Sequence, residues 1–324
     1  MQGQYKHSSF SILEIFNDLS NYTSNKETIV TLGTFDGVHL GHQKVLKKLV
    51  KISGPEISVL LTFFPHPRMV LQSSAEVKLI NTIDERISLL ENTGLDVLVI
   101  HKFTKEFSKQ SALDFVRNIL VGKLNISRLI IGYDHHFGKN REGNFEQLEE
   151  YSHSYGFGLT KISQKDVNKI AVSSTKIRKA IEDGSIRKAN KFLGYNFMLT
   201  GEVVQGKNLG EKLGFPTANL FIKETYKLIP KTGAYIVKSN LDGKTVYGMM
   251  NIGFRPTIHG KHKTIEIHFF DFNKVIYGNT IRVELLAFLR DEQKFETLED
   301  LKTQLRNDRE KSLEIIHGIY FDSE

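Results

Sequence analysis

A chain of 324 residues, 40% hydrophobic and 25% charged, is long enough for about two folded domains, and its composition excludes a disordered protein. No apolar run reaches the ~18 residues of a membrane span, no secretion signal is evident and there is no cysteine, which together predict a cytoplasmic protein without disulfides or thiolate metal sites. The net charge of +7 suits anionic ligands such as nucleotides, but the basic residues are spread along the chain rather than gathered in the dense blocks of nucleic-acid-binding tails.

The first half of the chain alternates short apolar runs with amphipathic ones, which is the pattern of a parallel sheet flanked by helices. The apolar runs predict strands at 28–35, 57–64, 96–103 and 128–134. Apolar residues at helical spacing predict helices at 42–52, 82–93 and 111–124. Because parallel strands need such crossovers, we expect an α/β, Rossmann-like N-terminal domain.

The segment GTFDGVHLGHQ, residues 33–43, joins the first of these strands to the first helix. A helix N-terminus at this place attracts phosphate, so a nucleotide is the expected ligand. The segment is neither a Walker loop nor a dinucleotide fingerprint. His39 and His42 could instead both donate hydrogen bonds to a triphosphate attacked at its α-phosphate. The HLGH spacing resembles the signature of nucleotidylyltransferases, although in isolation the two histidines could equally be turn residues.

Two further segments, FFPHPR and GYDHHFGKNREGN, follow predicted strands at the carboxyl ends, where open α/β sheets bind ligands. They make His66, Arg68 and Asp134 candidates for contacts with a second substrate. His135 and His136 are adjacent in a strand-like segment and would point to opposite faces. We therefore expect them to be a poor pair of metal ligands.

The segment VSSTKIRKA could close over a nucleotide from the far end of the sheet. Ser173 or Ser174 can cap the helix that follows, and Ser174 and Thr175 offer hydroxyl groups to phosphate. Arg178 lies one turn further on, within reach of a triphosphate. Taken alone, the segment is better explained by an ordinary helix N-cap with a surface arginine.

The second half of the chain changes to period-two runs, which predict closely spaced antiparallel strands at 197–204, 233–240, 244–254, 263–270 and 279–288. The pair Asp242-Gly243 is a strong hairpin signal between two of these runs. We expect a small barrel, followed by an amphipathic helix at 297–317 that packs against it. The predicted domains are therefore 1–194 and 195–324.

The segment GKNLGEKLGFPTANL gives the second half a candidate site of its own. A loop that contains Gly206, Gly210 and Gly214 precedes an extended stretch. In that stretch Thr217 and Asn219 are two positions apart and therefore lie on the same face. A hydroxyl and an amide carbonyl are hard oxygen ligands that suit Mg²⁺ when it keeps waters and takes phosphate oxygens from a nucleotide. The alternative interpretation is a Gly-Pro turn leading into an edge strand.

Taken in order, these segments closely resemble the bifunctional riboflavin kinase/FMN adenylyltransferase family of bacteria, also called FAD synthetase. The resemblance covers nearly the whole chain. It rests on GTFDGVHLGH, FFPHPR, GYDHHFGKNREGN and SSTKIR in the first half, and on GFPTAN, NIGFRPT, TIEIHFFDF and LRDEQKF in the second. It implies a nucleotidylyltransferase domain that transfers AMP from ATP to FMN with release of pyrophosphate. It also implies a β-barrel domain, closed by a C-terminal helix, that phosphorylates riboflavin.

The resemblance also implies the ligands and the residues that bind them in the first domain. The ligands are riboflavin, FMN, ATP and Mg²⁺, with no nucleic acid and no membrane as partner. Catalysis of adenylyl transfer is assigned to His39 and His42; ATP binding to Gly33, Phe35, Asp36, Gly41, Ser174, Thr175 and Arg178; and flavin binding to His66, Arg68 and Asp134.

In the second domain, the resemblance implies a metal and nucleotide pair, a catalytic carboxylate and a flavin contact. These are Thr217 and Asn219 for Mg²⁺ and ATP, Gly206 and Gly210 for ATP, Glu266 as the base that takes the proton from the riboflavin 5′-hydroxyl, and Arg290 beside the flavin. Taken alone, Glu266 could be an exposed strand carboxylate. The sequence departs from the family pattern at DHHFG, where relatives often have Asp-Phe-Arg-Phe-Gly, and at Glu211, where an arginine is common.

Two other functions stay open from the residues alone. One is a transferase with another acceptor, such as nicotinamide mononucleotide or pantetheine phosphate, and a noncatalytic barrel; PTAN and Glu266 argue against it. The other is a nucleic-acid-binding barrel, which would need aromatic residues interleaved with Lys or Arg, whereas TIEIHFFDF is aromatic but not basic. The sequence predicts neither the oligomeric state, nor the passage of FMN between domains, nor a preference for reduced flavin.

Overall fold

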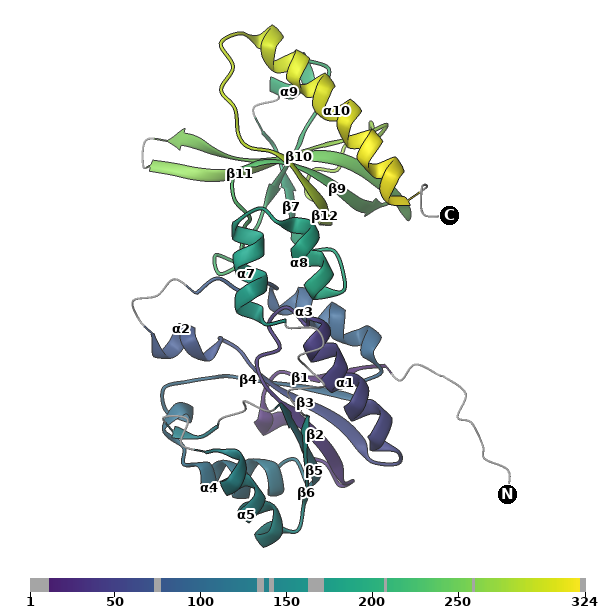
Figure 1. The fold of residues 1–324 in the computed structure, drawn as a ribbon. Helices are drawn as coiled ribbons and strands as arrows, with labels where there is room; N and C mark the ends of the chain where they lie inside the picture. The colour runs from purple at the N-terminus through teal and green to yellow at the C-terminus, as the bar shows by residue number, and fades with distance from the viewer. Residues whose placement is uncertain are drawn as a thin grey trace, which may run out of the picture. The chain divides into compact units, whose positions relative to one another are not determined.

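The computed structural model describes residues 12–72, 77–132, 137–139, 143–162, 172–206, 209–257 and 260–320. The chain divides between Ser174 and Thr175 into two compact units, each built on its own sheet (Figure 1). The predicted fold class, an α/β domain followed by a β-barrel with a C-terminal helix, is confirmed. The functional boundary predicted near Gly194 stays a prediction.

The first unit is built on a six-stranded sheet with the strand order β1-β4-β3-β2-β5-β6. Every neighbouring pair in it is parallel. The four predicted strands are confirmed as β2 to β5, and β1 and β6 are added at the edges. The bounds are β1 (Glu14–Phe16), β2 (Thr28–Leu32), β3 (Ile57–Phe63), β4 (Val97–His101), β5 (Ile126–Gly132) and β6 (Gly158–Ile162).

Helices cover both faces of this sheet because its central strands are apolar on both sides. On β2, Ile29 belongs to a buried cluster with α1 and α3, while Val30 belongs to another with η4 and α5. The predicted helix at 111–124 forms as a short α-helix continued by a π-helix. The bounds are α1 (Leu40–Ser53), α2 (Pro67–Leu71), α3 (Ile83–Leu90), α4 (Ala112–Asp114), η4 (Phe115–Val121) and α5 (Phe145–Tyr155), with 3₁₀ turns η1 (Leu19–Asn21), η2 (Glu91–Thr93) and η3 (Phe107–Lys109).

The position of β2 in this order places the first candidate site. Its two neighbours are β3, which follows it in the chain, and β5, which lies on its other side. The chain continues from β2 to β3 and β4 on one side and then crosses to β5 on the other, so the strand order reverses between β2 and β5. Open α/β sheets bind ligands at the carboxyl ends of the strands at such a switch point. The segment from Gly33 to His39, which follows β2, begins at this point.

The second unit is a closed antiparallel barrel with the strand order β10-β11-β8-β7-β12-β9. Five of its strands were predicted, and the Asp242-Gly243 hairpin is confirmed, since both residues have positive φ (53° and 77°) and the turn joins β9 to β10. The bounds are β7 (Met198–Val204), β8 (Ala218–Phe221), β9 (Gly233–Leu241), β10 (Lys244–Thr257), β11 (Gly260–Phe269) and β12 (Thr280–Arg290).

Helices complete the second unit: α7 (Ser174–Glu182), α8 (Ile186–Leu193), α9 (Leu209–Lys212) and α10 (Leu298–Tyr320). Asn190 fixes α8 to the barrel, because its amide donates to the Leu285 carbonyl and accepts from the Phe197 N–H, each at 2.8 Å. The predicted C-terminal helix is confirmed as α10, whose Ile316 is buried in a cluster with barrel residues.

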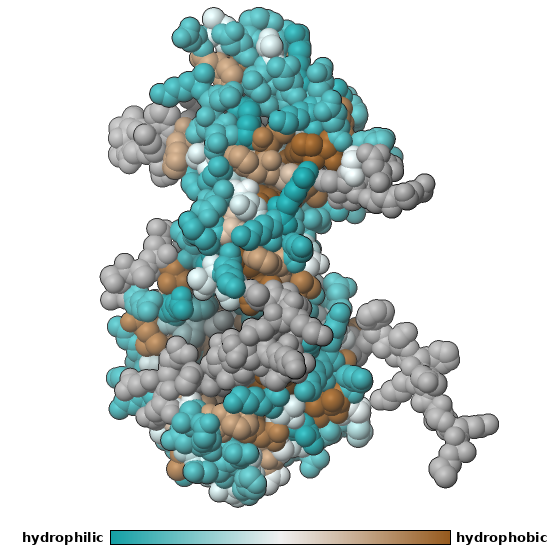
Figure 2. All heavy atoms as spheres, viewed as in Figure 1, coloured by the Kyte–Doolittle hydropathy of each residue, from teal (hydrophilic) through white to brown (hydrophobic). Residues whose placement is uncertain are grey.

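Hydrophilic residues predominate on the face of both units seen in Figure 2. Within the described part of the chain, no helix is long and apolar enough to cross a membrane.

Candidate active sites

The turn between β2 and α1 has an unusual backbone. Gly33, Phe35, Gly37 and Val38 have φ values of 156°, 47°, 89° and 33°. A non-glycine residue in the left-handed region costs roughly 1–3 kcal/mol, and it persists only where the surroundings hold it there. The glycine at position 33 also leaves room for Phe35, since a Cβ there would lie 3.3 Å from the Phe35 ring.

Asp36 anchors this turn from inside. Its carboxylate, 1% exposed, accepts the backbone N–H groups of Ile80 (3.0 Å) and Asn81 (3.3 Å), and the buried Arg86 guanidinium lies 4.0 Å away. Its backbone carbonyl accepts a hydrogen bond from the Ser174 hydroxyl at 2.9 Å. Ser174, one of the predicted ATP-binding residues, therefore lies at this turn. The Asp36 carboxylate holds the loop through its hydrogen bonds.

His39 and His42 lie together at the start of α1. The Nδ1 atom of His39 caps the helix by accepting the His42 backbone N–H at 3.3 Å, and the two rings stack with their centroids 3.7 Å apart. The Phe35 ring contacts His42, with 4.6 Å between centroids. The pair thus forms one aromatic stack at the carboxyl end of β2.

Both imidazoles are neutral at neutral pH. Burial lowers the pKa of His39 to about 4, against the opposing effect of Asp36. Burial also lowers the pKa of His42 well below its usual range, and the neighbouring His39 and Arg86 act in the same direction. Since Nδ1 of His39 accepts a hydrogen bond, its proton sits on Nε2, which is then a donor with a defined direction.

The lowered pKa of His39 predicts a pH dependence of stability that a His39→Asn variant should lack. The unfolded chain binds a proton below about pH 6.5 and the folded chain only below about 4, so stability is lost as the pH falls between these values. Over this window wild type should lose about 3 kcal/mol more than the variant, whose asparagine still caps the helix. Urea unfolding at both ends of the window measures this, and equal losses would refute it.

The second-substrate candidates of the first unit are only partly described. His66 caps α2 by accepting the Arg68 backbone N–H at its Nδ1 atom (3.1 Å), and the Arg68 side chain is exposed. Asp134, like His135 and His136, lies outside the described residues. Beside FFPHPR the structure adds an aromatic group at the carboxyl ends of β3 and β4, in which the Phe107 ring lies 5.6 Å from Phe63 and 4.6 Å from His101.

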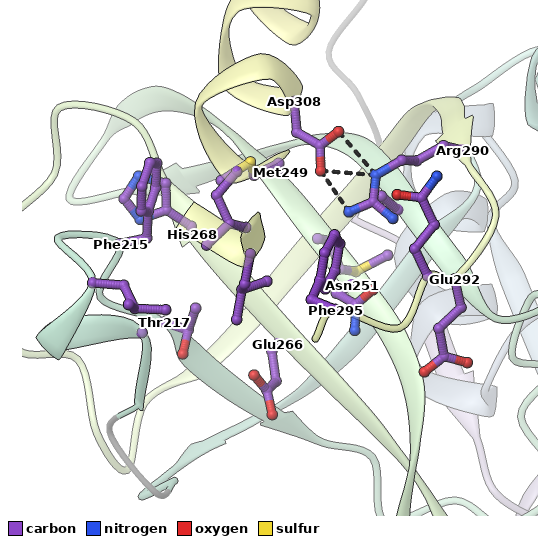
Figure 3. A pocket seen from close by; sticks show the side chains of 17 residues that line it. Phe215, Thr217, Met249, Asn251, Glu266, His268, Arg290, Glu292, Phe295 and Asp308 are labelled. Carbon is purple, nitrogen blue, oxygen red and sulfur yellow. Dashed lines mark hydrogen bonds and ion pairs between the residues drawn. The ribbon is translucent and has the colours of Figure 1, made fainter. Parts of the chain in front are cut away.

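The second unit contains a cavity of about 270 Å³ between the barrel and α10 (Figure 3). Four of the residues that line it were predicted as site residues, namely Gly210, Thr217, Glu266 and Arg290. The remaining lining residues are Leu213, Phe215, Ala234, Met249, Met250, Asn251, His268, Glu292, Gln293, Phe295, Leu301, Leu305 and Asp308.

Glu266 lies where neighbouring strands bring polar side chains together. On β11 it is paired with Asn219 of β8 on one side and with Asn251 of β10 on the other. Its neighbours Ile265 and Ile267 are buried in the barrel, so the Glu266 carboxylate lies on the opposite face of the strand.

The glycines of the β7–β8 loop allow the chain to close around Thr217 and Asn219. A Cβ at Gly206 would overlap the side-chain amide of Asn219, and a Cβ at Gly210 would overlap the Phe215 carbonyl. Thr217 immediately precedes β8 and lines the cavity. The two predicted ligands are therefore held close to Glu266, although 47 positions separate Asn219 from it in the chain.

Arg290 joins the end of β12 to α10. Its guanidinium donates to both oxygens of Asp308 (Nε to Oδ1 at 2.9 Å, Nη2 to Oδ2 at 2.7 Å), and its Nη1 donates to the Asp291 carbonyl at 3.0 Å. Asp308 is 4% exposed and also accepts from Gln304 at 2.8 Å. Sequence reasoning missed Asp308, which only the packing of α10 brings to Arg290.

In the comparison with known proteins, a separate family model matches each half of the chain. Residues 21–176 match the family model described as FAD synthetase, and residues 193–316 match the model described as riboflavin kinase. The bifunctional riboflavin kinase/FMN adenylyltransferase of Buchnera aphidicola subsp. Schizaphis graminum is 39% identical over 292 residues, covering 88% of this chain and 93% of the relative. The chain belongs to the bifunctional riboflavin kinase/FMN adenylyltransferase family.

A second relative and a solved structure agree with this assignment. The bifunctional riboflavin kinase/FMN adenylyltransferase of Listeria monocytogenes is 37% identical over 286 residues, covering 87% of this chain and 90% of the relative. A crystal structure described as a macrolide-efflux protein from Streptococcus pneumoniae has the same fold, with a TM-score of 0.83 and 28% identity over 93% of this chain and 98% of that one. The predicted family, with a FAD synthetase domain and a riboflavin kinase domain, is confirmed.

The family membership leaves the roles of individual residues as predictions. His39, His42 and Ser174 gather at one turn in the first unit, and Thr217, Asn219 and Glu266 gather in the second. Thr175 and Arg178 lie on α7, in the second unit, and their predicted contact with ATP stays a prediction. Glu211, which departs from the family pattern, is exposed on α9.

Proposed function

We propose that the riboflavin kinase activity of the chain is located in the cavity beneath α10 of the second domain, and that His39 and His42 of the first domain promote the transfer of AMP from ATP to the FMN so formed. The observation that carries the kinase assignment is a single cavity with a carboxylate, a hydroxyl and apolar walls. For the adenylyltransferase, the supporting observation is the stack of two neutral histidines at the carboxyl end of β2.

The cavity has two chemically different ends, with Glu266 between them (Figure 3). Thr217 and the glycine-rich loop form one end, which suits the phosphates of a nucleotide. Arg290, Phe295 and α10 form the other, where the Phe295 ring and the side chains of Leu301 and Leu305 can pack on the flavin ring. ATP enters at the first end and riboflavin at the second, so that the 5′-hydroxyl of riboflavin meets the γ-phosphate beside Glu266.

Phosphoryl transfer then needs one proton acceptor, and it needs riboflavin and the γ-phosphate to be held in a fixed orientation. Glu266 accepts the proton of the 5′-hydroxyl while the hydroxyl oxygen forms a bond to the γ-phosphorus and the bond to ADP breaks. The oxygens of Thr217 and Asn219 would hold Mg²⁺, and they fit it as hard ligands that the Gly206 backbone approaches closely. When bound, Mg²⁺ neutralises charge on the phosphates. Among the described residues no group of three or more His, Cys, Asp or Glu side chains could hold a metal ion.

Adenylyl transfer needs no strong base, because the phosphate of FMN is already an anion. Its oxygen attacks the α-phosphorus of ATP, and the bond to pyrophosphate breaks. His39 donates from Nε2 to an oxygen that gains charge in the transition state, and His42 supports it as a second neutral donor. Neutral donors avoid the desolvation cost of burying a cation before ATP arrives.

The proposal is tested by incubating the full chain with riboflavin, ATP and Mg²⁺ and separating the flavins over time. FMN should form first and FAD should follow. A chelator should stop both steps, and excess Mg²⁺ should restore them. Unchanged riboflavin would refute the kinase assignment, and accumulation of FMN without FAD would refute the adenylyltransferase assignment.

Asp308→Asn tests the flavin end of the cavity. The substitution keeps the size of the side chain but removes the charge that holds Arg290, and hydrogen bonds between charged groups are worth about 1.5–3 kcal/mol. The KM for riboflavin should rise about tenfold or more, while the KM for MgATP stays unchanged.

Asp242→Asn is the matched control for Asp308→Asn. It removes the exposed ion pair with Lys274, at a turn that accepts asparagine, and such pairs contribute about 0–1 kcal/mol. Initial rates of FMN formation should be those of wild type in this control. An unchanged riboflavin KM in Asp308→Asn would contradict the assignment of this end to the flavin.

A further inference from the structure

His268 lies in the kinase cavity, but neither the sequence nor the proposed mechanism gives it a role. It follows Glu266 by two positions on β11, so both side chains lie on the same face of the strand. It lines the cavity with Thr217, and Figure 3 shows its ring beside Phe215, at the nucleotide end and away from Arg290.

One hydrogen bond connects His268 to the chain that carries Thr217. Its Nδ1 atom lies 2.9 Å from the Pro216 carbonyl oxygen. A carbonyl only accepts, so Nδ1 is the donor and carries the proton. The next residue after Pro216 is Thr217, whose hydroxyl is the proposed ligand of the metal and nucleotide.

The hydrogen bond from His268 to Pro216 lies where the backbone pairing of β11 with β8 ends. β11 pairs with β8 at Glu266–Asn219 and Ile267–Ala218, and the next pair in this register would be His268 with Thr217. Pro216 has no N–H with which to extend the ladder. The side chain of His268 thus holds the turn at the point where backbone pairing no longer does.

Packing fixes the ring in this position. The buried rings of Phe215 and Phe270 meet it edge to face, with centroids 5.2 and 5.9 Å away. Burial lowers the pKa of His268, so the ring is neutral at neutral pH and still donates from Nδ1. A ring held by two aromatic neighbours directs its one donor with little freedom.

We propose that His268 is a positioning residue of the kinase site, which holds the Pro216–Thr217 turn so that the Thr217 hydroxyl faces the Mg²⁺-nucleotide. This inference rests on the proposed nucleotide end of the cavity. It assigns His268 no proton transfer and no contact with riboflavin, and its loss therefore acts on one substrate only.

Two substitutions separate the hydrogen bond from the packing. His268→Phe keeps a ring between Phe215 and Phe270 but has no donor, whereas His268→Asn loses the ring and keeps an N–H donor at the distance of Nδ1. Loss of one hydrogen bond corresponds to a rise of roughly fivefold to tenfold in the KM for MgATP. We expect this rise in His268→Phe and recovery of most of it in His268→Asn, with the riboflavin KM unchanged in both.

The test measures initial rates of FMN formation with each substrate varied in turn, and FAD formation from supplied FMN in the same samples as a control of integrity. A wild-type MgATP KM in His268→Phe, an equal rise in both KM values, a loss of kcat alone, or no recovery in His268→Asn would each overturn the proposal. If His268→Phe does not fold, a near-wild-type KM in His268→Asn is still required.

A third variant separates failure of this inference from failure of the nucleotide site itself. Thr217→Val removes the hydroxyl but keeps the shape of the side chain, and it should raise the MgATP KM at least as much as His268→Phe. If Thr217→Val has no effect, the proposed nucleotide end is wrong. If Thr217→Val raises the KM and His268→Phe does not, only the role of His268 is wrong.

Discussion

Glu266→Gln should abolish the formation of FMN from riboflavin, while the same protein still converts supplied FMN to FAD. A glutamine has the size of the side chain it replaces but cannot accept the hydroxyl proton. Removing a general base slows turnover by roughly two to four orders of magnitude. The position of Glu266 favours this role, because it lies opposite Asn219 and Asn251 on the face of β11 that lines the cavity.

Glu202→Gln is the matched control for this prediction. Glu202 is an exposed carboxylate on β7 that does not line the cavity, so the same chemical change there should leave both activities intact. Riboflavin consumption and FAD formation are measured in one preparation of each variant. Loss of both activities in Glu266→Gln would indicate damage to the fold, and retention of riboflavin phosphorylation would show that another group takes the proton.

The strands that could be predicted from the sequence are those with a continuous apolar or alternating pattern. β2 to β5 are apolar on both faces and stand out between amphipathic helices. β1 and β6 lie at the edges of the sheet, where polar and partly exposed residues interrupt the pattern. β8 has four residues and follows Pro216, so it is too short to be distinguished from a turn.

The same distinction applies to the site residues. His39 and His42 are close because they are three positions apart at a helix start, which the sequence itself specifies. The approach of Asn219 to Glu266 depends on the register of β8 and β11, so only the family resemblance indicated it. The anchoring of Asp36 by Arg86 and of Arg290 by Asp308 involves elements with no local relation in sequence, and only the folded structure reveals it.

His42→Ala should have the reciprocal effect to Glu266→Gln: riboflavin is still phosphorylated, but the reaction stops at FMN. His42 lies beside the stacked His39 ring at the end of β2, and its buried Nδ1 atom has no hydrogen-bond partner among the described residues. Loss of one preorganised donor to a developing charge costs about two to three orders of magnitude in rate.

The His42→Ala substitution leaves the start of α1 intact. A loss of FAD formation can therefore be assigned to the missing imidazole and not to a damaged helix. Alanine retains the backbone N–H that His39 accepts, and it is the residue that best favours a helix. His153→Ala, at an exposed position of α5 in the same unit, is the matched control and should form FAD at the wild-type rate. FAD formation from supplied FMN is the deciding measurement, because it bypasses the kinase. A rate near wild type in His42→Ala would mean that His39 and the backbone of the turn stabilise the transition state without it.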